Sequence, residues 1–130
     1  MKNIFALFLS LLYVNTYAEN TSTWSCLNPW VEISCHAEQC NFKTITEYFT
    51  PFRISIENQK DISICAYSGC WFGQVSHQQH STLSSYITQQ LQWNHSQQTS
   101  EKFIVNIDTE NKIGVLLGYS YALPLQCQAD

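Results

Sequence analysis

Charged residues are scarce in this sequence, and basic residues are the scarcest. Lysine and arginine together number 6 among 130 residues, against 10 aspartates and glutamates, for a formal net charge of −4 at pH 7. Nucleic acids and anionic membrane surfaces are bound through clustered basic side chains. The composition therefore argues against a nucleic acid partner. It also argues against membrane insertion once the apolar leader described below has been removed.

Charge is missing altogether from one internal stretch, residues 62–100, which contains no Asp, Glu, Lys or Arg. Interface cores in proteins are likewise depleted of charge and enriched in aromatic side chains. The stretch contains several large aromatic residues, and we take four as candidates for a binding face: Trp71, Phe72, Tyr86 and Trp93. The alternative is a neutral, hydrogen-bonding surface over a core that some of these residues help to fill.

Signatures of catalysis and of phosphate binding are also absent. Gly69 and Gly73 do not form a phosphate loop, and AYSGC has Ala66 and Cys70 where a nucleophile elbow needs glycine. The carboxylates fall where turns are expected, at Glu57, Asp61, Asp108 and Glu110. Solvated turn residues explain them, although acid–base chemistry with His80 is the hydrolase alternative. We expect a protein that is not an enzyme and that needs no cofactor.

Glycine and proline are few, with four and three residues, and no linker rich in them divides the chain. The N-terminus has the pattern of a signal peptide: Lys2, an apolar run over residues 4–14, and Ala18 at the expected cleavage point. This run is too short to span a bilayer comfortably. We expect cleavage after Ala18 and one domain over residues 19–130.

Cysteine, by contrast, is present in an even number, six. In an exported chain this count predicts disulfide bonds and a periplasmic or secreted protein. Two pairs share a spacing of four intervening residues, Cys35 with Cys40 and Cys65 with Cys70. A redox couple normally has two intervening residues, and zinc is disfavoured by an oxidising compartment and by six cysteines rather than four.

The geometry of a hairpin sets the condition for the Cys65–Cys70 bond. A two-residue turn at Ser68-Gly69 would leave these cysteines diagonal, about 7–8 Å apart, too far for an easy bond. A four-residue loop over residues 66–69 would place them opposite each other, at about 4.5–5.5 Å. We favour Cys65–Cys70 and Cys35–Cys40, with Cys26–Cys127 by elimination; crossed pairing remains open.

Three histidines are weak candidates for metal binding: His77, His80 and His95. A spacing of three places two imidazoles on opposite faces of a strand. No carboxylate follows His80 within twenty residues to act as a ligand or to orient a ring. Surface histidines are the simpler interpretation, and we predict no metal site.

Alternating apolar residues predict strands through most of the chain. The apolar positions predicted to share a face are Phe52, Ile54 and Ile56; Ile62, Ile64, Trp71 and Val75; Phe103, Val105 and Ile107; and Ile113, Val115, Leu117 and Tyr119. Residues 82–93 fit a helix or a strand, and we favour a strand with Leu83, Ile87, Leu91 and Trp93 on one face. The predicted fold is all-β: a small antiparallel meander of seven to eight strands, closed as a barrel or a sandwich and stapled by disulfides.

The string ICAYSGCW, with FTPFRISI before it and LPLQC near the end, resembles a group of small exported proteins of Gram-negative bacteria. This resemblance implies a periplasmic location and β architecture, and it implies no site residues. The expected architecture is also similar to periplasmic lysozyme inhibitors and small lipocalin-like barrels. We expect an exported, non-enzymatic binding module, inhibitor-like, for a ligand or protein of the cell envelope. An envelope hydrolase and a metal-handling protein are the alternatives.

Overall fold

The structure is a computed structural model that describes residues 23–130. The predicted signal peptide, residues 1–18, lies outside the described residues. Within the described part, no helix has the length and apolar character that crossing a membrane requires. The strands are β1 (Trp24–Leu27), β2 (Val31–His36), β3 (Gln39–Thr44), β4 (Arg53–Glu57), β5 (Asp61–Ala66), β6 (Gly69–His80), β7 (Leu83–Trp93), β8 (Gln97–Gln98), β9 (Phe103–Asp108), β10 (Ile113–Gly118) and β11 (Tyr121–Ala129).

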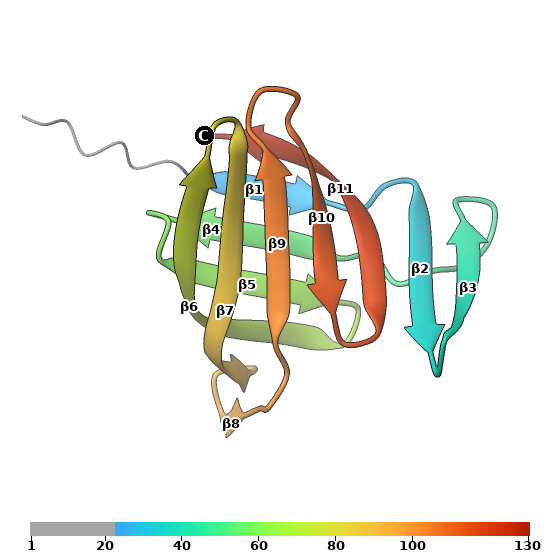
Figure 1. Cartoon of the computed structure of the whole chain (residues 1–130). Helices are drawn as coiled ribbons and strands as arrows, with labels where there is room; N and C mark the ends of the chain where they lie inside the picture. The colour runs from blue at the N-terminus through green and yellow to red at the C-terminus, as the bar shows by residue number, and fades with distance from the viewer. Residues whose placement is uncertain (1–22) are drawn as a thin grey trace, which may run out of the picture.

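Eight of these strands form a closed antiparallel barrel, in the order β1-β4-β5-β6-β7-β9-β10-β11 (Figure 1). The barrel closes because β1 pairs with both β4 and β11. The sequence left a barrel and a sandwich open, and the structure is a barrel. The predicted all-β meander is confirmed, including the strand, rather than helix, over residues 83–93.

Two further elements lie outside this closed ring. The β2–β3 hairpin is attached beside the barrel, where Ser34 pairs with Tyr121 of β11 (Figure 1). The buried carboxylate of Glu32, on β2, accepts a hydrogen bond from the backbone N–H of Thr50 at 2.6 Å. This contact ties the segment between β3 and β4 to the hairpin. The short strand β8 pairs with the end of β7.

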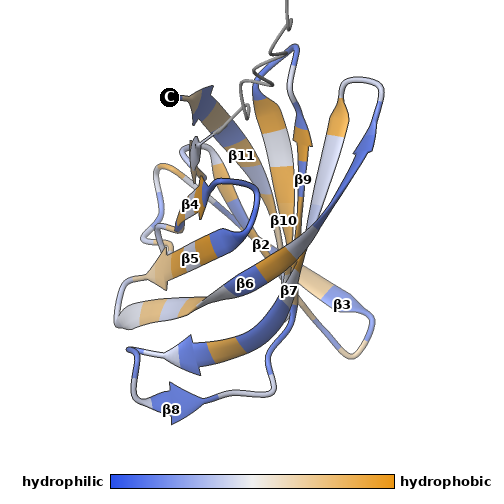
Figure 2. Cartoon of the chain, turned by 90° about the vertical axis from the view of Figure 1, so that its left-hand side faces the viewer, coloured by the Kyte–Doolittle hydropathy of each residue, from blue (hydrophilic) through white to orange (hydrophobic). Residues whose placement is uncertain are grey.

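The barrel interior is filled by apolar side chains that alternate along the strands, visible as successive orange and blue bands in Figure 2. Most of the predicted inward positions are buried: Phe52, Ile54, Ile56, Ile62, Ile64, Trp71, Val75, Phe103, Val105 and Ile107. The pattern works here because the largest apolar residues of these strands recur at every second position.

In strands β10 and β7, the side chains that face the barrel interior differ from those predicted. In β10 the inward residue is Leu116, which is fully buried, while Ile113 and Leu117 are exposed. This strand is apolar on both faces, so alternation could not identify the inward one. In β7 the buried residues include Ser84, Tyr86 and Leu91, while Leu83 and Ile87 face out. The change of parity within β7 arises from a β-bulge, described below.

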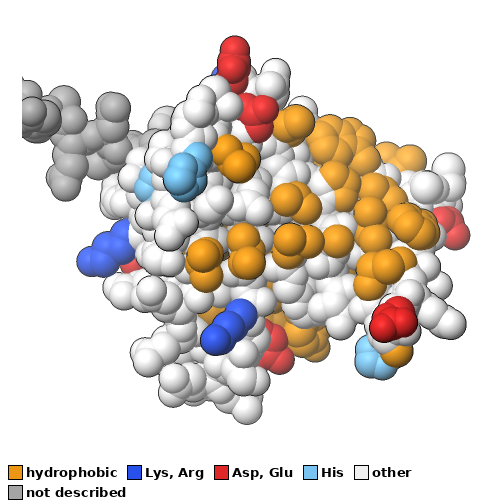
Figure 3. Space-filling model, in the orientation of Figure 1, with side chains coloured by type: hydrophobic (Ala, Val, Ile, Leu, Met, Phe, Trp, Pro, Cys, Tyr) orange, Lys and Arg blue, Asp and Glu red, His pale blue; other side chains and the backbone are white. Residues whose placement is uncertain are grey.

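Four outward-facing aliphatic residues form a row across the outside of the barrel. Ile87 pairs with Ile104, Ile104 with Leu117, and Leu117 with Ala122, in the registers of β7, β9, β10 and β11. Direct cross-strand partners share a face, so these side chains lie side by side. Figure 3 shows hydrophobic side chains spread over β9, β10 and β11.

The structure contains three disulfides, Cys26–Cys127, Cys35–Cys40 and Cys65–Cys70, which is the favoured pairing. Cys65 lies directly opposite Cys70, as the four-residue loop required. The turn itself is Tyr67-Ser68, flanked by the pair Ala66 and Gly69. Three disulfides in one small domain indicate an oxidising environment.

Candidate functional site: an aromatic cleft at one end of the barrel

Because the barrel is a meander, alternate turns open on the same end. The turns β4–β5, β6–β7 and β9–β10 lie at one end. The turns β5–β6 and β10–β11, and the β7–β9 connection that carries β8, lie at the other. The segment that leads into β4 also reaches this second end. Four parts of the chain that are distant in sequence therefore meet there.

A cleft of about 540 Å³ opens at this second end. Its lining comprises six aromatic residues, namely Phe52, Tyr67, Trp71, Trp93, Tyr119 and Tyr121. The remaining residues are Thr50, Ala66, Ser68, Gln97, Gln98, Thr99, Ser100 and Glu101. We call this site the aromatic cleft.

Trp71 is the centre of the aromatic floor. Its ring centroid lies 4.6 Å from that of Trp93 and 5.3 Å from that of Tyr119, with Phe103 packed against it at 5.1 Å. Trp71 is only 5% exposed, whereas Tyr119 is 54% exposed. Tilted contacts at these distances are favourable for aromatic rings. The rings therefore form one continuous surface with Trp71 at its base.

A β-bulge brings Trp93 to this floor. The register between β6 and β7 shifts between Phe72 and Gln74, where β7 has one more residue than β6. Gln90, in the bulge, has a φ of +34°. An extra residue reverses which side chains face inward. Even-numbered residues face the interior before the bulge, and Leu91 and Trp93 do so after it.

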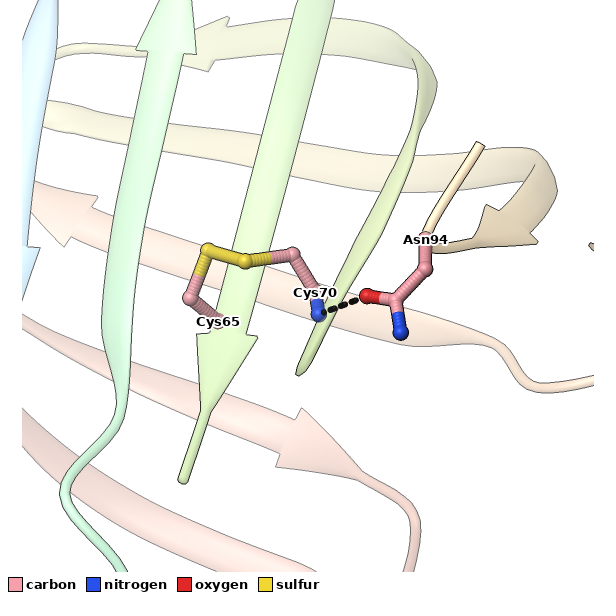
Figure 4. Close-up of a disulfide and its surroundings, with 3 residues drawn as sticks. All are labelled: Cys65, Cys70 and Asn94. Atoms are coloured by element: carbon pink, nitrogen blue, oxygen red, sulfur yellow. Dashed lines mark hydrogen bonds between the residues drawn. A yellow bond between two sulfur atoms is a disulfide. The ribbon is translucent and has the colours of Figure 1, made fainter. Parts of the chain in front are cut away.

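Asn94 holds two walls of the cleft together (Figure 4). Its side-chain Oδ1 accepts a hydrogen bond from the N–H of Cys70 at 2.9 Å, and its own N–H donates to the carbonyl of Cys70 at 2.8 Å. Gly69 permits this approach, because a Cβ there would lie 2.5 Å from Asn94 Oδ1 and 2.6 Å from Trp93 Cζ2. The Cys65–Cys70 disulfide closes the same hairpin. The β5–β6 turn is thus fixed against the end of β7.

The β10–β11 turn contributes Tyr119 through an unfavourable backbone conformation. Tyr119 and Ser120 form a two-residue turn with φ of +50° and +65°, the primed geometry that suits a hairpin. Asn and Gly are the residues that usually occupy these positions. Tyr119 instead places its ring over Trp71, with the Tyr121 ring centroid 6.4 Å away.

Polar side chains form the wall opposite this turn, along β8 and the segment that leads into β9. Within residues 23–130, the side chains of Gln97, Gln98, Ser100 and Ser68 make no hydrogen bond. Their donors and acceptors are therefore available to a bound molecule. Glu101 is the one charged side chain that lines the cleft among the described residues.

The four candidates for a binding face do not form one surface. Trp71 and Trp93 meet in the aromatic cleft, but Phe72 points outward and stacks on His95, with centroids 3.6 Å apart. Tyr86 is fully buried. Strand alternation explains the first correction, because neighbours such as Trp71 and Phe72 must face opposite ways. Tyr86 lies on the inward face before the bulge and belongs to the core.

The histidine candidates for metal binding lie apart from the cleft. His77 stacks on Tyr86 at 4.7 Å, His80 is exposed at the end of β6, and His95 packs on Phe72. In the described part of the chain, no group of three or more His, Cys, Asp or Glu is arranged to hold a metal ion.

The residues of the hydrolase alternative lie at the opposite end of the barrel. Asp108 Oδ1 accepts hydrogen bonds from the backbone N–H groups of Glu110 and Asn111, at 3.0 and 3.1 Å. The Asn111 side chain donates to Oδ2 at 2.8 Å and, with these backbone bonds, lowers the pKa of Asp108. Asp108 therefore caps its own turn. Leu83 stands between His80 and Asp108 in the cross-strand row, so the two are two strand spacings, about 10 Å, apart.

The sequence patterns do not identify the three tyrosines of the cleft, Tyr67, Tyr119 and Tyr121, as binding residues. One signal was present: aromatic residues flank the chain reversals near Ser68, Asn94 and Ser120. In a meander these reversals gather at one end. Using that signal required the strand count and the bulge, which the sequence alone did not supply.

The chain matches no protein-family model, no curated protein and no solved structure. Its function is therefore inferred from the cleft. An aromatic floor beside a wall of free amides and hydroxyls can hold a ligand that has both an apolar face and polar groups.

Proposed function

We propose that the protein is an exported, non-enzymatic binding module whose ligand occupies the aromatic cleft. The observation that carries this proposal is a cleft of about 540 Å³ in which contacting aromatic rings face unpaired polar side chains. Ligand sites typically measure roughly 300–1,000 Å³ and combine apolar walls with a few polar groups. The cleft falls within this size range and combines six aromatic residues with a more extensive polar wall.

The proposed place of action is the periplasm or the exterior of the cell. Three disulfides indicate an oxidising compartment. The resemblance of ICAYSGCW to exported proteins of Gram-negative bacteria, together with the predicted signal peptide, supports the same location. The ligand is then a component of the cell envelope or its surroundings.

Retention of envelope compounds by the exported protein tests this proposal. The purified protein is immobilised, exposed to fractionated envelope extract, and washed, and the retained compounds are identified by mass spectrometry. Trp93→Ala removes a ring of the cleft, whereas Trp30→Ala removes an exposed tryptophan that does not line it. We expect a compound held by the parent and by Trp30→Ala and lost, by about tenfold or more, from Trp93→Ala. Equal retention on all three proteins, or none on any, would contradict the proposal.

A further inference from the structure

Resting on this proposed function, we infer that the aromatic cleft binds an uncharged carbohydrate, with one face of a sugar ring against the aromatic floor. The C–H groups on one face of a pyranose are apolar and pack against the face of an aromatic ring. The hydroxyl groups around its edge need both donors and acceptors. The cleft presents these two requirements on adjacent walls.

The charged side chains around the cleft argue against an anionic ligand. In the described structure, no lysine or arginine lines the cleft, and Glu101 gives it a single negative charge. A phosphate, sulfate or uronate would meet no counter-ion there, and Glu101 would repel it. The carboxylate of Glu101 is an acceptor and pairs well with hydroxyl donors. The charges therefore argue against an anionic ligand and favour one that is rich in hydroxyl donors.

The unpaired polar side chains are the second step. The amides of Gln97 and Gln98 each offer donors and an acceptor, and the hydroxyls of Ser68 and Ser100 offer both. A purely apolar ligand would desolvate these groups and give them no partner, which is unfavourable. A sugar satisfies them while its apolar face covers Trp93 and Tyr119.

The arrangement of the rings is the third step, because it separates a sugar from other ligands. Trp71 contacts Trp93 and Tyr119 at centroid distances of 4.6 and 5.3 Å, so an organic cation cannot enter between Trp71 and either neighbour, as it would between the walls of a cage. A peptide often binds by adding a strand to a free sheet edge. At the cleft the described chain offers only the two-residue strand β8 for that purpose.

Tyr119 supplies the variant that tests the inference without destroying the fold. Its φ of +50° is costly for a residue with a side chain and costs nothing for glycine. Tyr119→Gly therefore relieves the backbone while it removes the exposed ring of the floor. Ser120→Gly relieves the neighbouring position of the same turn, φ +65°, and leaves the floor intact.

The experiment titrates the exported protein with four neutral tetrasaccharides, of glucose in α- and β-1,4 linkage, of mannose and of N-acetylglucosamine. Tetragalacturonate is the anionic counterpart, and a library of uncharged hexapeptides is the peptide arm. Binding is followed by tryptophan fluorescence and calorimetry. We expect at least one neutral sugar to bind, with tetragalacturonate about tenfold weaker or more. Trp93→Ala and Tyr119→Gly should each weaken the neutral sugar about tenfold, and Trp30→Ala and Ser120→Gly should not.

The results that would contradict the carbohydrate inference can be told apart from those that would contradict the binding function. If only hexapeptides or tetragalacturonate bind, and Trp93→Ala abolishes that binding, the carbohydrate inference is overturned and the binding function stands. Neutral-sugar binding that survives both Trp93→Ala and Tyr119→Gly also overturns it, because the sugar is then bound elsewhere. If no probe binds, the inference fails, and retention from envelope extract decides separately whether the binding function fails with it.

Discussion

At the residue scale, two positions in the left-handed region of backbone conformation shape the cleft. Asn94 and Tyr119 both have a φ of +50°. Asparagine tolerates this region, and Asn94 also uses its side chain to hold Cys70. Tyr119 has no such advantage, and its conformation costs about 1 kcal/mol or more. In return, this conformation places the Tyr119 ring over Trp71.

Tyr86 carries a cost of another kind. Its hydroxyl is buried and, in the described part of the chain, has no partner in good hydrogen-bonding geometry, although the side chains of Ser84 and Trp24 lie near enough to lower its pKa in part. An unsatisfied buried polar group costs about 1–3 kcal/mol. Tyr86→Phe should therefore leave the free energy of unfolding unchanged or raise it by up to about 2 kcal/mol in urea denaturation. The exposed Tyr67→Phe is the control, with no expected change.

The buried hydroxyl of Tyr86 also makes the free energy of unfolding depend on pH in alkaline solution. Burial raises the pKa of Tyr86 above its ordinary value of 10.0. As the pH rises past 10, the unfolded chain releases this proton while the folded chain keeps it, so the folded state loses stability. We expect the Tyr86→Phe protein to lose less stability than the parent between neutral pH and pH 11 in the same urea measurement. A loss as steep as that of the parent, or a variant destabilised at neutral pH, would contradict this account of Tyr86.

At the element scale, the sequence predicted the strands well and their facing less well. Strand β4 alternates cleanly, with Ile54 and Ile56 inward. Strand β10 has apolar residues on both faces, and its inward positions include Gly114 and Gly118, which have no side chain to mark them. A period of two cannot choose between equally apolar faces. The packing of Leu116 inside the closed barrel settles the choice.

Neighbouring leucines in β10 test this facing. Leu116 is fully buried, and Leu117 is 41% exposed. Leu116→Ala should lower the free energy of unfolding by about 2–5 kcal/mol, because it leaves a cavity in the core. Leu117→Ala should cost less than about 1 kcal/mol, as measured by chemical denaturation. Equal losses, or a larger loss at Leu117, would show that β10 faces the other way.

At the scale of the whole molecule, the cleft depends on relations that no short stretch of sequence contains. The sequence identified Trp71 and Trp93 as candidates, from aromatic residues in an uncharged stretch. Their meeting depends on the bulge at Gln90 and on pairing between β6 and β7. Tyr119 joins them only because the barrel closes and brings the β10–β11 turn to the same end. Closure is thus the property on which both the fold and the site depend.

The disulfide between Cys26 and Cys127 secures that closure. It links β1 to β11 at directly paired positions, and the two cysteines are 101 residues apart in the sequence. Closing so long a loop restricts the unfolded chain by about 4–5 kcal/mol, against about 2 kcal/mol for a loop as short as that of Cys35–Cys40. We therefore expect Cys26→Ala with Cys127→Ala to lower the free energy of unfolding by about 4–5 kcal/mol. Cys35→Ala with Cys40→Ala, in the hairpin outside the barrel, should cost at most about 2 kcal/mol. Urea denaturation of the two double variants measures both, and similar losses would mean that the barrel closes without help from this bond.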